Sequence, residues 1–146
     1  MKNKILFLSS VLLFSLKISC ITKEQQDIVN HVKKSITLAS EEKSNINKPI
    51  LQMKGMSSPK VRHLLNNLCT LPNCNYLEIG LWKGSTFMSA LSNNDSSINS
   101  AIGIDNWSKI VGSPRDAFFQ NIQKLSNIGS VTIYEEDSFK VGSVEF

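Results

Sequence analysis

The chain has 146 residues, of which 41% are hydrophobic and 19% are charged, and its formal net charge is +4. This composition is ordinary for a globular protein, so it excludes a disordered or repetitive chain, and the length fits a single domain. Because the lysines are spread along the sequence without interleaved aromatic residues, we interpret them as solvated surface charge and expect no nucleic-acid partner.

The first twenty residues differ from the rest of the chain. Two lysines precede an apolar run at residues 5–16, and Ser19 and Cys20 follow it, which is the layout of a secretory signal peptide. The run is shorter than the roughly 20 apolar residues that span a bilayer. Lys17 stands where a lipoprotein cleavage site has an apolar residue, so a lipoprotein is the weaker alternative. We therefore expect a secreted or periplasmic protein with membrane contact through residues 1–20, with a cytoplasmic protein as the alternative.

Cleavage near Cys20 would leave two cysteines, Cys69 and Cys74. An oxidising compartment could join them in a disulfide. The alternative, which we favour, is that both are buried small hydrophobic side chains.

An N-terminal helical region is expected over residues 21–72. The segment 22–25 has the pattern of a capping box, and Ile28, Val32 and Ile36 recur on one face of a helix that should run to about residue 40. Residues 41–54 have no sustained period and are interpreted as a connecting segment.

A second helix should begin at Ser58 and Pro59, which supply an N-cap and a proline at the first helical position. Its apolar residues recur at helical spacing, and the helix should end near Thr70. These residues are Val61, Leu64, Leu65 and Leu68.

Residues 73–146 alternate between strand and helix patterns. Short apolar strands are expected at residues 76–79, 101–104 and 131–134, and helices at residues 86–91 and from Ser113-Pro114 onward. Strands separated by helices pair in parallel through right-handed crossovers. The predicted fold class is therefore α/β, with an incomplete Rossmann-like sheet of three parallel strands and flanking helices.

A glycine-bounded turn at residues 80–84 connects the first strand to the next helix. Such a turn brings backbone amides close to a ligand. A dinucleotide fingerprint has a second glycine two positions after the first, where this chain has Trp82, and a P-loop has a longer spacing and its lysine after the second glycine. Neither motif fits, so an oxidoreductase that uses a dinucleotide is disfavoured.

The sequence Glu-Ile-Gly-x-x-x-Gly-Ser-Thr at residues 78–86 resembles the first motif of class I methyltransferases that use S-adenosyl-L-methionine (SAM). The resemblance extends over roughly residues 55–139. It implies that Gly80 and Gly84 wrap the methionine portion of SAM and that Glu78 lies near its amino group. A carboxylate suits a ligand that carries an ammonium and a sulfonium.

The resemblance assigns three more cofactor-binding residues at the ends of the later strands. Asp105 would accept hydrogen bonds from the ribose hydroxyls, Trp107 would pack beside the adenine, and Asp137 would meet the adenine amino group. The family usually has Gly-Asp-Ser around the last position, where this chain has Glu136.

Each of these residues has a simpler interpretation alone: the acids as helix caps or surface carboxylates, the tryptophans as packing residues. Jointly, and in order along the strands, they favour a SAM site. His31 and His63 each occur without metal-ligand spacing, so no metal site is expected. No catalytic residue is assigned.

The sequence ends at Phe146, before a fourth strand. We therefore expect an N-terminal fragment of a methyltransferase that binds SAM weakly or not at all, transfers no methyl group, and self-associates through an exposed sheet edge. The methyl acceptor is unknown. The alternative function is an exported or membrane-associated, non-enzymatic interaction module that retains the first half of the fold.

Overall fold

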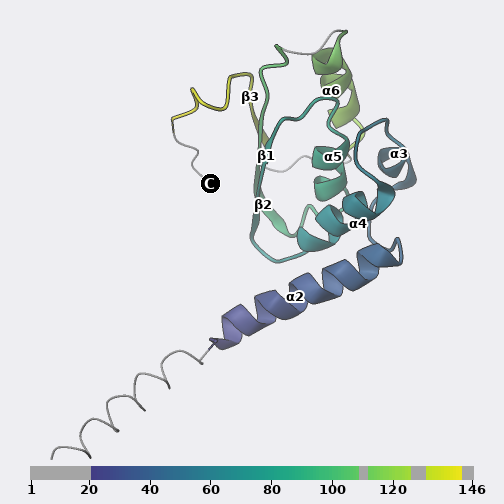
Figure 1. The fold of residues 1–146 in the computed structure, drawn as a ribbon, viewed down its shortest axis with the longest axis vertical. Helices are drawn as coiled ribbons and strands as arrows, with labels where there is room; N and C mark the ends of the chain where they lie inside the picture. The colour runs from purple at the N-terminus through teal and green to yellow at the C-terminus, as the bar shows by residue number, and fades with distance from the viewer. Residues whose placement is uncertain (1–20, 109–111, 126–130, 143–146) are drawn as a thin grey trace, which may run out of the picture. The chain divides into compact units, whose positions relative to one another are not determined.

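The computed structural model describes residues 21–108, 112–125 and 131–142 (Figure 1). The signal-peptide-like segment 1–20 therefore lies outside the described residues. The chain divides into two compact units, Met1–His31 and Val32–Phe146. Within the described part of the chain, no helix has both the length and the apolar character needed to cross a membrane.

Helix α2 (Lys23–Ser40) begins with the predicted capping box. The Thr22 N–H donates to Gln25 Oε1 at 3.0 Å, and the Gln25 N–H donates to Thr22 Oγ1 at 3.2 Å. The apolar stripe found in the sequence is nevertheless largely exposed, whereas Ser35 and Ala39 are buried. The spacing of the stripe correctly predicted a helix, and the stripe is not part of the core of the described residues.

A short helix, α3 (Lys48–Leu51), lies in the segment that was predicted to be a connection. The side chain of Asn47 caps it by accepting a hydrogen bond from the Ile50 N–H at 3.0 Å. The Ile50 side chain is fully buried. The prediction was wrong here because one turn of helix is too short to show a hydrophobic period.

Helix α4 (Pro59–Leu68) is capped by Ser58, as predicted. Its most buried face is polar, with Asn66 at its centre, whereas Val61 of the predicted stripe is exposed. The Asn66 amide donates to the carbonyl oxygens of Ser89 and Ser92 at 2.9 and 2.8 Å. Hydrogen bonds therefore help to attach this helix to the end of α5. The buried polar residues of α4 are Arg62, His63, Asn66 and Asn67.

Three parallel strands form the sheet in the order β1-β2-β3, which confirms the predicted α/β fold with an incomplete Rossmann-like sheet. The strands are β1 (Cys74–Ile79), β2 (Ile98–Ile104) and β3 (Val131–Tyr134). Cys69, the C-cap of α4, and Cys74, the first residue of β1, are free thiols. Cys69 is buried, as expected, whereas Cys74 is only partly buried.

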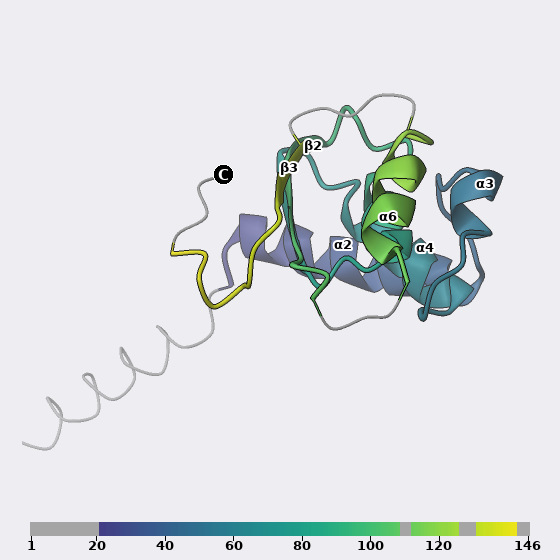
Figure 2. The ribbon, with the colours of Figure 1, turned by 90° about the horizontal axis from the view of Figure 1, so that it is seen from above.

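The two crossover helices, α5 (Ser85–Leu91) and α6 (Pro114–Ile122), lie on the same face of the sheet, as Figure 1 shows for both and Figure 2 for α6. Right-handed crossovers that progress in one direction across a sheet place their helices on one side. The core lies between the sheet and these helices. There the centroid of the Phe87 ring lies 5.8 Å from that of Tyr76 and 6.1 Å from that of Phe118.

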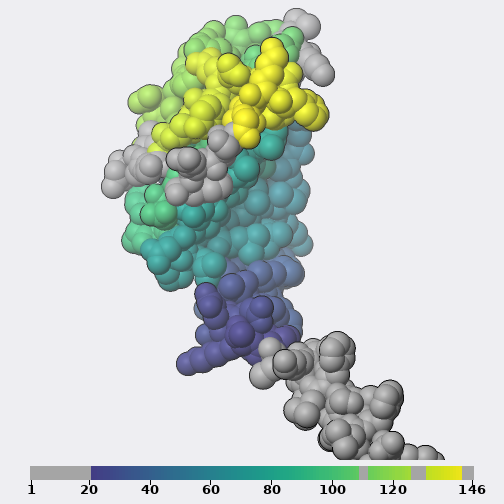
Figure 3. All heavy atoms as spheres, turned by 90° about the vertical axis from the view of Figure 1, so that its left-hand side faces the viewer, coloured from purple at the N-terminus to yellow at the C-terminus, as the bar shows by residue number. Residues whose placement is uncertain are grey.

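The opposite face of the sheet carries apolar residues that are paired in register. Leu77 pairs with Ile102, and Ile79 pairs with Ile104. The two β2 residues are buried, but Leu77 is 42% exposed and Ile79 is 61% exposed. Figure 3 shows this side of the molecule, with the residues that follow β3 drawn in yellow. Within the described residues, β1 pairs with β2 alone, so its other edge is open.

Candidate functional site

Three cavities lie at the carboxyl ends of the strands and meet at Gly80, which lines all of them. The volume is about 280 Å³ for the cavity beside α5, about 260 Å³ for the central one and about 220 Å³ for the one beside the segment after β3. Each alone is smaller than a typical ligand pocket of about 300 to 1,000 Å³. Neighbouring cavities share lining residues, and we call the three together the groove, which extends from the start of α5, past β1 and β2, to the segment after β3. We name them by position: the α5 cavity (Met56, Ser57, Gly80, Leu81, Trp82, Ser85, Thr86), the central cavity (Met56, Gly80, Trp82, Asp105, Asn106, Trp107, Ser108) and the β3 cavity (Ile79, Gly80, Ile104, Asp105, Asn106, Glu136, Asp137, Ser138, Phe139).

The two glycines of the turn are needed for different reasons. Gly80 has a φ of +87°, and a Cβ added to it would have no heavy atom within 4 Å. Gly84 has a φ of +83°, and an added Cβ would lie 2.7 Å from Met88 Cε and 2.8 Å from a Phe118 ring carbon. Gly80 therefore leaves space in the groove, whereas Gly84 lets the turn pack closely on the core.

Asp105 lies at the end of β2 and holds two loops together. Its Oδ2 accepts a hydrogen bond from the Trp82 N–H at 2.8 Å, and its Oδ1 accepts one from the Trp107 N–H at 2.7 Å. An ionised carboxylate has about four acceptor positions. Two remain for a ligand on a side chain that lines both the central and the β3 cavities.

Both tryptophans that donate to Asp105 have left-handed backbone conformations. The φ angles are +47° for Trp82 and +46° for Trp107, which are unusual for bulky side chains. The Trp107 Nε1–H donates to the Trp82 carbonyl oxygen at 2.8 Å, and the Trp107 ring packs 5.6 Å from that of Phe118. The strained backbone of these two residues is therefore stabilised by the Asp105 carboxylate, by the indole hydrogen bond and by packing of the Trp107 ring on the aromatic core.

Glu78 points toward the helix layer and does not line any of the three cavities. Its Oε2 accepts a hydrogen bond from the Tyr76 hydroxyl and its Oε1 one from the Thr86 hydroxyl, each at 2.6 Å. Burial raises the pKa of this carboxyl, and the two hydrogen bonds oppose the rise. In this arrangement Thr86 stands between Glu78 and the α5 cavity.

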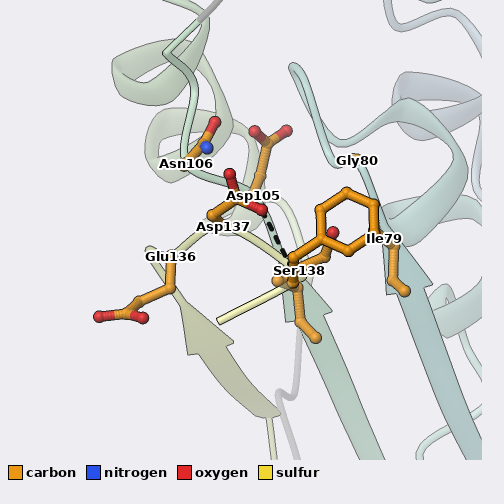
Figure 4. Close-up of a pocket in the computed structure, with 9 residues that line it drawn as sticks. Ile79, Gly80, Asp105, Asn106, Glu136, Asp137 and Ser138 are labelled. Atoms are coloured by element: carbon orange, nitrogen blue, oxygen red, sulfur yellow. Dashed lines mark hydrogen bonds between the residues drawn. The ribbon is translucent and has the colours of Figure 1, made fainter. Parts of the chain in front are cut away.

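The segment after β3 forms the far wall of the groove (Figure 4). Asp137 lies on the same side of the cavity as Asp105, and its Oδ1 accepts a hydrogen bond from the Phe139 N–H at 3.0 Å. The Glu136 side chain points away from the other labelled residues. Phe139 is 98% exposed although it lines the cavity.

Of the residues predicted from the sequence, the structure brings Gly80, Asp105, Trp107 and Asp137 to the groove. Gly84 lies behind it, as does Glu78. The motif did not indicate Met56 and Ser57, which line the α5 cavity from the loop before α4.

The feature of the sequence that relates to this loop is Gly55. In the structure, a Cβ added to Gly55 would lie 2.0 Å from Ser85 Oγ. That contact depends on the fold, so the sequence alone could not have shown it. Among the described residues, no group of three or more His, Cys, Asp or Glu side chains could hold a metal ion.

No family model, curated protein or solved structure matches this chain.

Proposed function

We propose that the groove binds SAM and that the chain is a methyltransferase-type protein of class I. The observation that carries the proposal is the junction at Gly80, where an unobstructed backbone position meets the Asp105 carboxylate. A ligand that crosses the end of β1 can approach the chain closely there and then reach an acidic acceptor.

The order of chemical groups along the groove suits the parts of SAM. The α5 cavity, with the hydroxyls of Ser57 and Ser85, would take the methionine portion. Asp105 would accept hydrogen bonds from the ribose hydroxyls with its two remaining acceptor positions. The adenine would lie in the β3 cavity beside Asp137 and Phe139.

The charges of the groove favour a cationic ligand over a phosphate. The β3 cavity is lined by Asp105, Glu136 and Asp137, and carboxylates repel phosphates but attract a sulfonium. Lys83, which lies within the turn, places its Nζ 4.9 Å from the centre of the Trp82 ring, in a cation–π contact. Bound SAM would supply an electrophilic methyl group for in-line transfer to a nucleophile, and the acceptor is not assigned.

Equilibrium dialysis of the full-length chain against labelled SAM and labelled NAD⁺ tests this proposal. We expect saturable binding of SAM and no binding of NAD⁺ at the same concentration. Binding is expected to be weak because, in the described residues, β1 has an open edge beside the groove. Equal retention of both ligands, or retention of neither at millimolar concentration, would contradict the proposal.

The exposed edge of β1 supports a second candidate, a non-enzymatic module that pairs with a second copy of itself. Leu77 and Ile79 expose apolar surface beside an edge of β1 that pairs with no strand among the described residues. Light scattering after size-exclusion chromatography should then show a dimer that Leu77→Lys converts to a monomer. A monomeric native chain would exclude this candidate.

A further inference from the structure

Two free thiols lie where the chain passes from α4 into β1. Cys69 is the C-cap of α4 and Cys74 is the first residue of β1, so residues 70–73 alone separate them. The Cys69 N–H donates to the Leu65 carbonyl oxygen at 3.1 Å, and the Cys74 N–H donates to that of Ser97 at 2.8 Å. Both cysteine backbones are therefore anchored by hydrogen bonds to the surrounding structure.

The residues between the two cysteines are turned rather than extended. The Thr70 N–H donates to the Asn67 carbonyl oxygen at 3.2 Å, which tightens the chain at the end of α4. Asn73 has a left-handed φ of +57°, a conformation that asparagine adopts more readily than most residues. These turns shorten the path from one cysteine to the other.

The two side chains lie in the layer between the sheet and the helices. Residues of β1 alternate between half-buried and exposed positions, and Cys74, Tyr76 and Glu78 share the half-buried face. On this face the Tyr76 ring packs against Phe87 of α5. Cys69 is buried at the end of α4. The two thiols therefore belong to one cluster with Tyr76 and Glu78.

The groups of this cluster act on one another. Burial raises the pKa of the Cys69 thiol, and the Cys74 thiol and then the Glu78 carboxylate raise it further. Because Cys69 is buried and resists ionisation whereas Cys74 is partly exposed, Cys74 is the thiol that an oxidant reaches first. The partial exposure of Cys74 also favours pairing over the interpretation of both cysteines as buried hydrophobic side chains.

We propose that Cys69 and Cys74 form a reversible disulfide that links the end of α4 to the start of β1, with a small disulfide such as oxidised glutathione as the oxidant. The Cys74 thiolate attacks one sulfur of the oxidant, which forms a mixed disulfide and releases the first glutathione thiolate. The Cys69 thiol then loses its proton to solvent and attacks Cys74 Sγ, which expels the second glutathione thiolate. Two cysteine thiols are thus oxidised, one glutathione disulfide is reduced, and the protons of the cysteines pass to the released thiolates. The inference does not depend on the ligand of the groove.

Oxidation of the reduced full-length chain with glutathione disulfide, followed by alkylation of the remaining thiols, tests the proposal. Because trypsin cleaves after Arg62 and Lys83 and at no residue between them, the peptide 63–83 contains both cysteines. We expect this peptide to take up no alkyl group after oxidation and two after treatment with a reductant. A peptide that still takes up two alkyl groups, that carries glutathione on both cysteines, or that is linked to Cys20 would overturn the proposal.

Single substitutions separate the roles of the two thiols. Cys69→Ala should leave Cys74 as a mixed disulfide with glutathione, whereas Cys74→Ala should leave Cys69 largely unmodified because Cys69 is buried. Cys20→Ser removes the third cysteine of the chain and, as the matched control, should not change the oxidation of peptide 63–83. Equal glutathione uptake by Cys69→Ala and Cys74→Ala would contradict the assigned order of attack. Circular dichroism melts check that each variant is folded.

A comparison of the folded and unfolded chain shows whether the fold itself favours the disulfide. In a glutathione redox buffer, we expect the equilibrium constant for forming the disulfide in Cys20→Ser to be roughly tenfold larger in the folded chain than in concentrated urea, because the link restricts the unfolded chain. The oxidised chain should accordingly melt at a higher temperature than the reduced chain. An equal or smaller equilibrium constant in the folded chain would overturn the proposal.

Discussion

The carboxylate of Asp105 accepts a hydrogen bond from the backbone N–H of Trp82 at 2.8 Å, although the two residues are 23 positions apart in the sequence. Its other oxygen accepts the Trp107 N–H. One side chain at the end of β2 therefore fixes both the turn after β1 and the loop that follows β2. The two loops frame the central cavity, so their positions relative to each other determine its shape.

We predict that Asp105→Ala lowers the free energy of unfolding by about 2 to 4 kcal/mol, because two charge-assisted hydrogen bonds to strained backbone are lost. Urea denaturation at neutral pH measures this change. The exposed Asp95 provides the control, since Asp95→Ala should change stability by less than about 0.5 kcal/mol. Equal effects of the two substitutions would show that Asp105 does not brace the loops.

Gly80→Ala should abolish SAM binding as well as destabilise the fold. The φ of +87° costs an alanine about 1 to 2 kcal/mol. Gly112 is a matched control, because its φ is +104° and an added Cβ would also have no heavy atom within 4 Å. Gly112→Ala should lose similar stability but retain SAM affinity, since Gly112 does not line the groove. Equal SAM affinity in the two variants would contradict the role of Gly80.

Stability should fall as pH rises through the titration of Glu78. Burial raises the folded-state pKa of this carboxyl above its ordinary value of 4.5, so the folded state binds the proton more tightly than the unfolded state. The resulting stabilisation is complete below pH 4.5 and is lost as pH rises through the folded-state pKa. Urea denaturation across this pH range should show the loss in the native chain and a smaller loss in Glu78→Gln. The same slope in both proteins would exclude Glu78 as its source.

Substitution of Phe118 should affect the stability of the fold, whereas substitution of Phe139 should affect SAM binding alone. Phe118 is fully buried, and Phe118→Ala should destabilise the fold by about 3 to 5 kcal/mol. Phe139 is almost fully exposed, and Phe139→Ala should leave stability within about 0.5 kcal/mol of the native value. Stacking of the ring on adenine predicts that Phe139→Ala weakens SAM binding by about tenfold. Unchanged affinity in this variant would remove Phe139 from the adenine site.

The strand and helix pattern of the sheet region could be predicted because local signals and tertiary contacts agree there. Residues 131–134 are β-branched or aromatic and form β3 as expected. The Gly80 turn follows a strand, as expected, and its two glycines have positive φ. The acids at the strand ends lie at one edge of the sheet because the strands are parallel.

Helices α2 and α4 could be predicted in position but not in orientation, and α3 was not predicted at all. Hydrophobic periodicity indicated that Val61 and its neighbours form one helix face, yet the most buried face of α4 carries Arg62 and Asn66. Amide hydrogen bonds to the end of α5 determine that orientation, and such long-range contacts leave no period in the sequence. The position of Ser57 in the groove depends on the same packing.

The chain has two tryptophans, and both line the central cavity, so their indole N–H signals in a two-dimensional NMR spectrum report directly on the groove. We predict that SAM shifts the Trp107 signal saturably, that NAD⁺ at the same concentration does not, and that Asp105→Ala removes the response. Indole signals that stay in place at millimolar SAM, or that respond equally to NAD⁺, would contradict the proposal that this groove is a SAM site.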